Sequence, residues 1–358
     1  MPPLAAAPAI HVDPAPDVLI VGAGAFGLWT ARACRTRGLR IEICDAGRVG
    51  DAQGASGGPV GALAPHRPSP WTALKALQFE AIRDLPKRLA ALEAETGCAT
   101  GAARVGRAAP FVSAEARLRA EARLPEAALR WPGFRQWIED APPGLVAPHG
   151  VLRDDLTARL APRPTAQALR TALPPQAIRD GDPLLDASDP RRPVLASGPR
   201  PAGATVLAAG VAIRELLPMP ALEPEHGQAA RLGAVLPSGT PLIQGPGLWI
   251  VPQPDQVAVG STSERGREDL VTDAGLDALI AKARALLPAL AEAPVLERWA
   301  GLRPRFASRG PLAGEVAPGL LVATGGFKIG LALAPSIGDA VAAVLSGEPN
   351  PLAPEFRP

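Results

Sequence analysis

Three glycines in the spacing Gly-x-Gly-x-x-Gly and one aspartate are the residues of this sequence whose types and order point most directly to chemistry. The glycines are Gly22, Gly24 and Gly27, and the aspartate is Asp45. Gly22 would make a tight turn, Gly24 would let the backbone approach a pyrophosphate, and Gly27 would let a helix pack closely on a strand. Asp45 could accept hydrogen bonds from ribose hydroxyls and argues against a 2′-phosphate. The motif predicts a dinucleotide site without choosing between NAD and FAD.

The segments around these residues predict the elements that such a site needs. Residues 17–21 form a short apolar run of the kind that is buried on both faces of a parallel sheet. A helix is expected over 28–37, and its positive N-terminal end can bind phosphates. A second strand over 40–45 ends at Asp45. Because 37 glycines produce such spacings by chance, this context is what favours a dinucleotide site over a chance glycine loop.

Two later strands also end in small residues, which let the backbone lie against a bound ligand. The first is expected over 204–210 and ends in Ala208, Ala209 and Gly210. The second begins at Gly319 and runs into glycines and then into a helix expected to end near Ser346. This second unit repeats the order of strand, glycines and helix, so its helix N-terminus could face an electron-rich group.

The rest of the chain supplies the expected framework. A loop rich in Gly, Ala, Ser and Pro covers 47–70, and a loop of that length in a compact domain usually has a binding role. Long helices are expected over 71–95 and 274–287. Between 231 and 263 the pattern predicts β-hairpins, the first strand of which would be 232–236. No tandem repeat of fixed period is present.

Composition limits the classes of function. A chain of 358 residues with a formal net charge of +2 suits two joined domains and lacks a broad basic field for nucleic acid. Three cysteines without a CxxC pair indicate a reducing cytoplasm. Residues 1–16 are expected to be a disordered lead-in and not a signal peptide. No apolar run is long enough for a membrane span, and the four histidines have no metal-binding spacing.

Several motifs together resemble the FAD-dependent D-amino acid oxidase superfamily, in its glycine oxidase and sarcosine oxidase group. The likeness covers nearly the whole chain. It is carried by Gly-Ala-Gly-Ala-Phe-Gly with Asp45, by Gly54 to Pro65, by Ala208 to Gly210, by Val257 to Glu264, by Gly301-Leu302-Arg303-Pro304, and by Ala323 to Lys328.

This resemblance implies FAD in an extended, noncovalent form, with AMP on the first β-α-β unit and the flavin ring between two domains. A cysteine that could attach the flavin, as in some sarcosine oxidases, is missing from the C-terminal third. The implied contacts are Gly22, Gly24, Ala25, Phe26, Gly27, Asp45 and Ala46 for AMP, Gly54, Ala55 and Ser56 for the pyrophosphate, Leu184 for adenine, Gly61, Ala62 and Leu63 beside the flavin, Ala208, Ala209 and Gly210, and Gly325, Gly326, Phe327, Lys328 and Ile329 at the pyrimidine end of the ring.

The implied fold is an α/β, Rossmann-like FAD-binding domain, discontinuous in sequence, joined to an α+β substrate domain built on an antiparallel sheet. The FAD-binding domain would comprise 17–75, 151–215 and 300–358, and the substrate domain 76–150 and 216–299.

The implied reaction is oxidation of a C–N bond by hydride transfer to flavin N5, with O2 as the acceptor. Arg303 matches the arginine that binds the substrate carboxylate in glycine oxidases, and Lys328 matches a lysine that contributes to carboxylate binding in sarcosine oxidases. A guanidinium fork suits a bidentate carboxylate contact. Either residue could instead be structural, and the pair favours a small, carboxylate-bearing amine more than either alone.

Some features depart from the family pattern and leave alternatives open. The chain has no tyrosine, whereas a tyrosine hydroxyl helps to hold the substrate in several members. A noncatalytic flavin-binding protein is therefore one alternative, and a tRNA wobble-uridine modification oxidoreductase of the same fold is another. An NAD-dependent dehydrogenase would not explain the C-terminal glycines. His66, Trp71, Trp249 and Trp299 could lie near the ring, although a loop histidine and core tryptophans are the ordinary interpretation.

Overall fold

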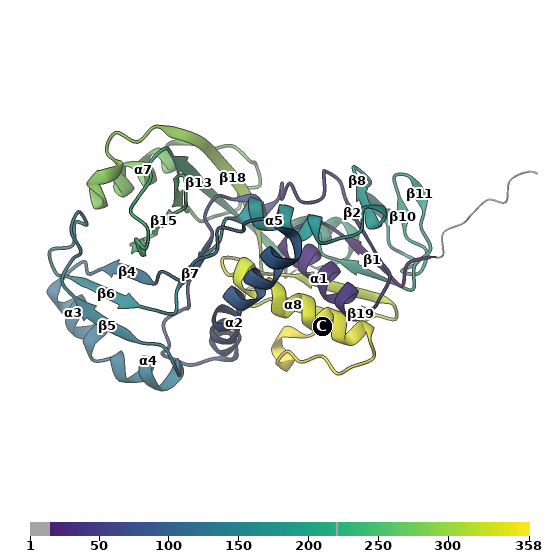
Figure 1. Ribbon diagram of the computed structural model, residues 1–358. Coiled ribbons are helices and arrows are strands. Elements are labelled where there is room, and N and C mark those ends of the chain that lie inside the picture. The colour runs from purple at the N-terminus through teal and green to yellow at the C-terminus, as the bar shows by residue number, and fades with distance from the viewer. Residues whose placement is uncertain (1–14, 220) are drawn as a thin grey trace, which may run out of the picture.

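The computed structural model describes residues 15–219 and 221–358, and it arranges them in two units side by side (Figure 1). The lead-in expected over 1–16 lies outside the described residues as far as position 14. Pro16 is already attached to the fold, because its carbonyl accepts a hydrogen bond from the Gly203 N–H at 3.0 Å. The described chain contains no helix that is both long and apolar enough to cross a bilayer.

A six-stranded sheet forms the centre of the first unit. In spatial order its strands are β19 (Leu312–Ala317), β20 (Leu320–Thr324), β12 (Ala204–Leu207), β1 (Val18–Val21), β2 (Ile41–Asp45) and β8 (Ile178–Asp180). All neighbours are parallel except the edge strand β19. All four residues of β1 are buried, as expected for a strand covered on both faces. The α/β, Rossmann-like prediction is confirmed.

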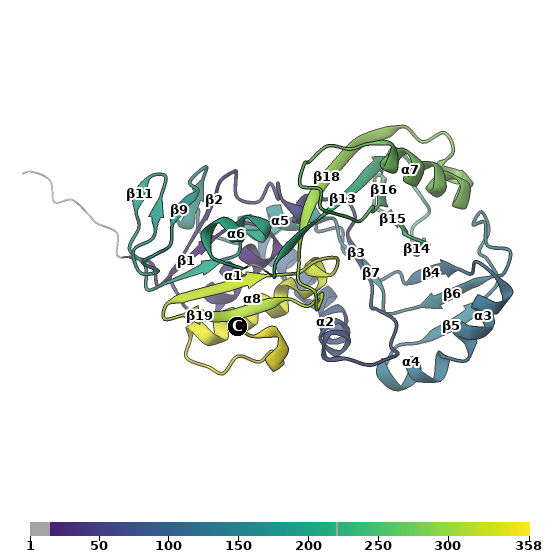
Figure 2. The ribbon, with the colours of Figure 1, turned by 180° about the vertical axis from the view of Figure 1, so that it is seen from behind.

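Helices cover one face of this sheet, and a small antiparallel sheet covers the other (Figure 2). The helices are α1 (Ala25–Thr36), α2 (Ala73–Thr96), α5 (Pro162–Thr171) and α8 (Gly330–Leu345). The opposite layer consists of β9 (Leu184–Asp186), β10 (Val194–Leu195), β11 (Gly198–Pro199) and the short helix α6 (Ile213–Leu216). Helix α1 begins at Ala25 and not at Leu28, because the turn that Gly22 makes leads directly into the helix.

A nine-stranded, mostly antiparallel sheet forms the second unit. Its strands are β4 (Arg107–Pro110), β5 (Gln136–Glu139), β6 (Val151–Asp154), β13 (Glu223–Leu232), β14 (Leu242–Gly245), β15 (Leu248–Pro252), β16 (Val257–Gly260), β17 (Glu264–Arg265) and β18 (Val295–Arg305). Helix α7 (Ala274–Leu286) packs on one face through a buried apolar cluster. The opposite face is turned toward the first unit. Two short helices, α3 (Ala114–Glu121) and α4 (Leu124–Arg130), lie beside β5 and β6.

Two features of this sheet differ from the sequence-based expectations. The strand expected over 232–236 is wrong, since β13 ends at Leu232 and extends back to Glu223. Strand β18 pairs with β13 from Val295 through Arg305, so the expected domain boundary at 300 falls inside a strand.

The helix α2, which was expected in the substrate domain from 76 onward, contributes to the apolar core of the first unit. We propose that the domain division follows the two sheets, with crossings after α2, after β6, before β13 and after β18.

Short elements complete the path between the units. Strands β3 (Ala62–Leu63) and β7 (Ala158–Arg159) pair with each other where the chain crosses. Single 3-10 turns occur at Ala55–Gly57, Pro175–Ala177, Gly210–Ala212, Pro288–Leu290 and Pro354–Phe356.

Candidate functional site

The glycine turn after β1 is fixed by close contact with β12. Gly22 has φ +98°, and a Cβ there would lie 2.7 Å from the backbone carbonyl of Ala208. A Cβ at Gly27 would lie 1.8 Å from the Gly22 carbonyl oxygen, so the first turn of α1 rests directly on the loop. Both glycines are therefore required by the approach of backbone to backbone, which agrees with the mechanical roles expected of them.

Side chains from two distant segments meet at the N-terminus of α1. The Asp45 carboxylate, half-buried at the end of β2, accepts from the Ala23 N–H at 2.7 Å and from the Gly47 N–H at 2.9 Å. The Ser56 hydroxyl accepts from the Ala25 N–H at 2.9 Å. No acidic side chain stands in the first turn of α1, so its positive end is available to an anion.

A continuous cavity of about 1270 Å³ begins here and runs between the two units. This volume exceeds the roughly 300–1,000 Å³ of ordinary small-ligand pockets, as an extended dinucleotide with a substrate beside it requires. Among the residues expected from the sequence, the following line the wall: Gly22, Gly24, Ala25, Phe26, Asp45, Ala46, Gly54, Ala55, Ser56, Ala62, Leu184, Ala208, Ala209, Gly210, Arg303, Gly326, Phe327, Lys328 and Ile329. The sequence motifs thus converge on one cavity.

Four expected contact residues lie behind the wall instead. Gly27 and Gly61 are packed against backbone, since a Cβ would approach Gly22 in the first case and the Leu160 carbonyl oxygen, at 1.8 Å, in the second. Leu63 is 1% exposed and belongs to the apolar core of the first unit. Gly325 has φ +78° and lies under the Phe306 ring. These four residues do not line the cavity, so we propose that they shape its wall from behind without contacting a ligand.

Arg303 lies at the far end of the cavity, on β18. Its side chain is buried, and its Nη1 donates to the Thr262 carbonyl at 3.2 Å. Within residues 15–219 and 221–358, no carboxylate forms an ion pair with it. Burial lowers the pKa of Arg303, and the nearby Glu225 acts in the opposite direction. A buried guanidinium that keeps most of its donors free and faces a cavity is suited to bind a carboxylate.

The guanidinium of Arg303 rests on a glycine of the neighbouring strand. A Cβ at Gly227 on β13 would lie 2.0 Å from Nη1 and 2.1 Å from Nη2 of Arg303. Gly227 is opposite Gly301 in the β13 and β18 pairing. The missing side chain at Gly227 therefore leaves the space that the Arg303 guanidinium occupies.

We expect Gly227→Ala to impair substrate binding with little effect on folding. The clashing atoms belong to the end of a flexible side chain, so the guanidinium can move aside and the free energy of unfolding should fall by less than about 1 kcal/mol. Because that movement misplaces the carboxylate donor, KM for an amino-acid substrate should rise about tenfold. Steady-state kinetics and thermal unfolding measure the two effects. In an Arg303→Ala background the same change should leave KM unaltered, and an additional rise there would contradict this explanation.

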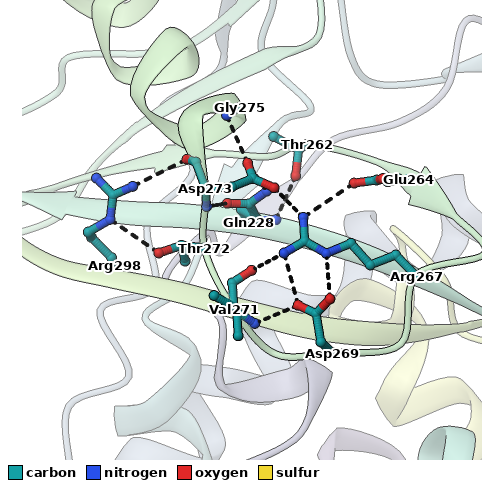
Figure 3. A network of polar contacts seen from close by, with 10 residues as sticks. All are labelled: Gln228, Thr262, Glu264, Arg267, Asp269, Val271, Thr272, Asp273, Gly275 and Arg298. Carbon is teal, nitrogen blue, oxygen red and sulfur yellow. Dashed lines mark hydrogen bonds and ion pairs between the residues drawn. The ribbon is translucent and has the colours of Figure 1, made fainter.

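The Thr262 carbonyl that accepts from Arg303 belongs to a residue held in a polar network with Gln228 and Asp273, which Figure 3 shows. Gln228, 1% exposed on β13, clamps Asp273 by accepting from its N–H at 2.8 Å and donating to its Oδ1 at 2.9 Å. The Gln228 N–H donates to Thr262 Oγ1 at 2.8 Å, and the Thr262 N–H donates back to the Gln228 carbonyl at 3.2 Å. Hydrogen bonds from Gln228 and Arg267 lower the pKa of Asp273 to about 2. The position of Thr262, and through it that of Arg303, is thereby set from α7.

A cluster of cations surrounds one buried carboxylate beside Arg303. Glu225 lies 3.4 Å from Arg305 Nε and 3.8 Å from Lys328 Nζ, and it also accepts from the Ser263 hydroxyl. The Phe327 ring lies below both cations, 5.7 Å from Arg305 Cζ and 5.3 Å from Lys328 Nζ. Burial, and then the charge of Arg303, lower the pKa of Lys328. Positive charge is therefore in excess at this end of the cavity.

Aromatic and histidine side chains complete the wall. Trp249 and Trp299 line the cavity, and the Trp299 ring lies over two glycines, because a Cβ at Gly301 would be 2.3 Å from its Cζ2 and a Cβ at Gly58 would be 2.9 Å from its Cη2. The ring thus contacts both the loop that follows Ser56 and β18, the strand that carries Arg303. Trp71 is elsewhere, under Arg130.

His66 is exposed at the cavity wall. Although its side chain reaches the surface, the surrounding walls remove enough water to lower its pKa, and Lys75, Arg309 and Arg107 act in the same direction. A neutral imidazole is the form that this environment favours.

The sequence pattern did not single out Glu225, Gly227 or Gln228. All three lie on β13, whose sequence Glu-Pro-Glu-His-Gly-Gln has no alternation of apolar residues. A buried polar strand has no signature in hydrophobic periodicity, and no local signal could have found them.

Comparison with known proteins was made with this geometry in hand. A family model described as FAD dependent oxidoreductase (DAO) matches residues 17–344. Glycine oxidase of Pseudomonas aeruginosa is 31% identical, over 95% of this chain and 99% of that protein. A tRNA 5-methylaminomethyl-2-thiouridine biosynthesis bifunctional protein of Acidovorax sp. is 30% identical over 93% of this chain but only 58% of its own length. The crystal structure of glycine oxidase from Geobacillus kaustophilus superposes with a TM-score of 0.83 at 23% identity, covering 96% of this chain and 98% of that one.

Proposed function

Since this chain belongs to the FAD dependent oxidoreductase (DAO) family, whose members oxidise amines or amino acids, we propose that it acts on a small amino acid with a free carboxylate and that O2 accepts the electrons. The observation that carries the proposal is Arg303, a buried guanidinium that faces the cavity without an ion-pair partner in the described chain. In the overall reaction, the amino acid, O2 and water would give an oxo acid, an amine or ammonia, and H2O2.

FAD is the cofactor of this family, and the cavity wall fits it. The N-terminus of α1 and the Ser56 hydroxyl would hold the pyrophosphate, and Asp45 would face the ribose of the AMP half. Gly326 and its neighbours before α8 would approach the ring. When bound, FAD supplies the acceptor for the hydride that leaves the substrate carbon. The two cysteines that are deep in the first unit, Cys34 and Cys44, have a pKa that burial raises to about 12, which supports noncovalent binding.

Arg303 and Lys328 would bind and orient the substrate. Arg303 can hold the carboxylate with two parallel hydrogen bonds, while Lys328 adds a flexible point charge from the loop before α8. A fixed carboxylate leaves the adjacent carbon and its amine with few orientations, which is how binding energy becomes positioning. Trp249 and Trp299 would flank the substrate and exclude water from it.

The excess of positive charge would also favour the neutral form of the substrate amine over the ammonium. A hydride leaves the carbon of a neutral amine more readily than that of an ammonium, because the nitrogen lone pair must form the new C=N bond. Arg303, Arg305 and Lys328 disfavour another cation nearby, so they should lower the pKa of a bound ammonium group. The proton can then be lost to solvent before oxidation.

The pH dependence should identify the contribution of Lys328. Its pKa is lowered from the ordinary 10.5, so the ammonium loses its charge, and its attraction for the substrate carboxylate, as the pH rises through that lowered pKa. KM should therefore increase on the alkaline side at a lower pH than an ordinary lysine would give. Lys328→Arg keeps the charge and should shift this increase to higher pH. An identical alkaline limb in the variant would contradict the assignment.

A panel of amines tests the proposed reaction. The purified protein should be yellow, and anaerobic mixing with glycine, N-methyl amino acids and D-amino acids should bleach the flavin with the true substrate. Air should then restore the colour and produce H2O2. A colourless protein would contradict the FAD assignment at this site, and a yellow protein that no amine bleaches would favour a noncatalytic flavin-binding role. The latter outcome would agree with the absence of tyrosine from the chain.

A second candidate is the modification of a wobble uridine in tRNA, which the Acidovorax sp. relative supports. A carboxymethylaminomethyl group offers the same C–N bond and the same carboxylate. The net charge of +2 speaks against a large RNA partner. If tRNA that carries this group bleaches the flavin and free amino acids do not, tRNA modification would replace the first proposal.

The three free thiols in the structure support the cytoplasmic location proposed from the sequence.

A further inference from the structure

One face of α3 borders a part of the cavity that the proposed reaction does not use, and we call this part the arm. Ala116, Arg119, Ala120 and Arg123 all border the cavity, with the spacing i, i+3, i+4 and i+7 that places residues on one side of a helix. Arg123 lies two residues after the end of α3, and both it and the intervening Ala122 keep a helical backbone conformation. The two alanines leave space, and the two arginines border it. Arg67, from the loop after His66, lies on the same wall.

The arginines of this region differ in their partners according to the side they occupy. Arg117, away from the cavity, donates to the His149 carbonyl at 3.1 Å, and Arg130 pairs with Glu126 at 3.2 Å. Arg119 and Arg123 border the cavity, and their side chains have neither a hydrogen bond nor an ion pair with any residue of 15–219 or 221–358. Both side chains are exposed, and no carboxylate of the described chain compensates their charges.

The distribution of acidic residues strengthens the contrast. The only acidic residues on the wall, within the described chain, are Asp45 and Glu215, and both belong to elements of the first unit. Arg107, at the base of the arm, is already neutralised by Asp154 at 2.6 Å and bonds Gln244 at 2.9 Å. The uncompensated charge of the arm is therefore that of its outer arginines. A cavity lined by one sign of charge concentrates ligands of the opposite sign.

We propose that Arg67, Arg119 and Arg123 form a second anion subsite, and that the preferred substrate is an amino acid with a second acidic group. The proposal rests on the proposed function, in which Arg303 binds the first carboxylate. The second acid would be joined through the amine nitrogen or the side chain and would extend into the arm. Three arginines inside a cavity are too few to neutralise the many phosphates of an RNA, so a small diacid is the occupant that the charges favour.

Binding can be measured apart from turnover with thioether acids, which lack an amine and cannot be oxidised in this reaction. The probes are thiodiacetate and its homologues with longer arms, each compared with the thioether in which the second carboxylate is an amide. Perturbation of the flavin spectrum of the holoenzyme gives Kd for each pair. The best diacid should bind about tenfold more tightly than its amide at low salt, and the difference should shrink at high salt.

Charge reversal of the arm gives the decisive comparison. In the double variant Arg119→Glu, Arg123→Glu the diacid should lose its advantage, while Kd of the amide stays within about twofold. The neutral double variant Arg119→Ala, Arg123→Ala is a control for any effect of the new acids on folding, and in it too the diacid should lose its advantage. Arg192→Glu, an exposed change in the turn between β9 and β10, should leave both constants unaltered.

The outcomes separate this subsite from the proposed reaction. Equal binding of diacid and amide to the natural chain, or an advantage that survives both double variants, would overturn the subsite. If the diacids bind as expected while no amine bleaches the flavin, the oxidase proposal fails and the subsite stands. If amines are oxidised but N-(carboxyalkyl)glycines are no better substrates than their terminal amides, the diacid preference is overturned and the oxidase proposal stands.

Discussion

Replacing Arg303 by alanine is expected to raise KM for carboxylate-bearing amino acids by at least about 30-fold, which corresponds to about 2 kcal/mol or more. The guanidinium is buried and has only the Thr262 carbonyl as a hydrogen-bonding partner in the described chain, so most of its donors remain for a ligand. The lost interaction is a charge-assisted hydrogen bond out of water, where such bonds are strongest. Steady-state kinetics with the best amine of the panel provides the measurement.

The matched control is Arg135→Ala in the second unit. Arg135 is exposed, pairs with Asp155 at 3.6 Å and does not line the cavity, so its loss should leave KM unchanged. Amines without a carboxylate should be oxidised equally by the natural chain and by the Arg303→Ala variant. If KM for amino acids is the same in both proteins, Arg303 does not bind the substrate and its role is structural.

Gly22→Ala should abolish flavin binding. The backbone at Gly22 has φ +98°, which an alanine adopts only at a cost of about 1–2 kcal/mol. The new methyl group would also lie 2.7 Å from the backbone of Ala208, which directly follows the central strand β12 and cannot move aside as a side chain can. The turn must therefore shift, which moves the N-terminus of α1 away from the phosphate position. The flavin content of the purified protein and its unfolding temperature are the two readouts.

Gly38→Ala separates the two causes. Gly38 also has a positive φ, +81°, but a Cβ there meets nothing within 4 Å, so only the conformational cost applies. This variant should lose about 1–2 kcal/mol of stability and keep its full complement of flavin. If Gly22→Ala binds flavin as well as Gly38→Ala does, the contact with Ala208 is not what requires a glycine in the turn.

Local sequence was sufficient for the glycine turn of the first unit and for the elements that flank it. The apolar run of β1, the glycine turn and the helix after it are successive in the chain, and each follows from backbone sterics and from burial on both faces. The same holds for α2, expected over 71–95 and found at Ala73–Thr96 between the Thr72 cap and Gly97 with φ +70°. Caps, turns and periodicity are short-range signals, so they can be recognised without knowing the partners.

The second unit was less accessible to the same reasoning. Strand β13 consists largely of buried residues, yet it carries Glu225, His226 and Gln228 on a run without apolar alternation. Its partner β18 comes more than sixty residues later and pairs with it over its whole length. The expected division between the two domains at 300 falls inside this strand, because only the pairing identifies 295–305 as one element.

The sequence by itself predicted a dinucleotide site and an α/β architecture from local motifs, and its resemblance to a known family added FAD and the two candidate cations, Arg303 and Lys328. Only the tertiary structure decided what surrounds those cations: Gly227 beneath the Arg303 guanidinium, the support from Gln228 and Thr262, and the carboxylate of Glu225. It also placed the unpaired Arg119 and Arg123 on the wall of the same cavity. The physical reason is that charge balance and steric space depend on distances between segments far apart in the chain. The glycine turn holds one end of the cavity, and the pairing of β13 with β18 sets the chemistry of the other.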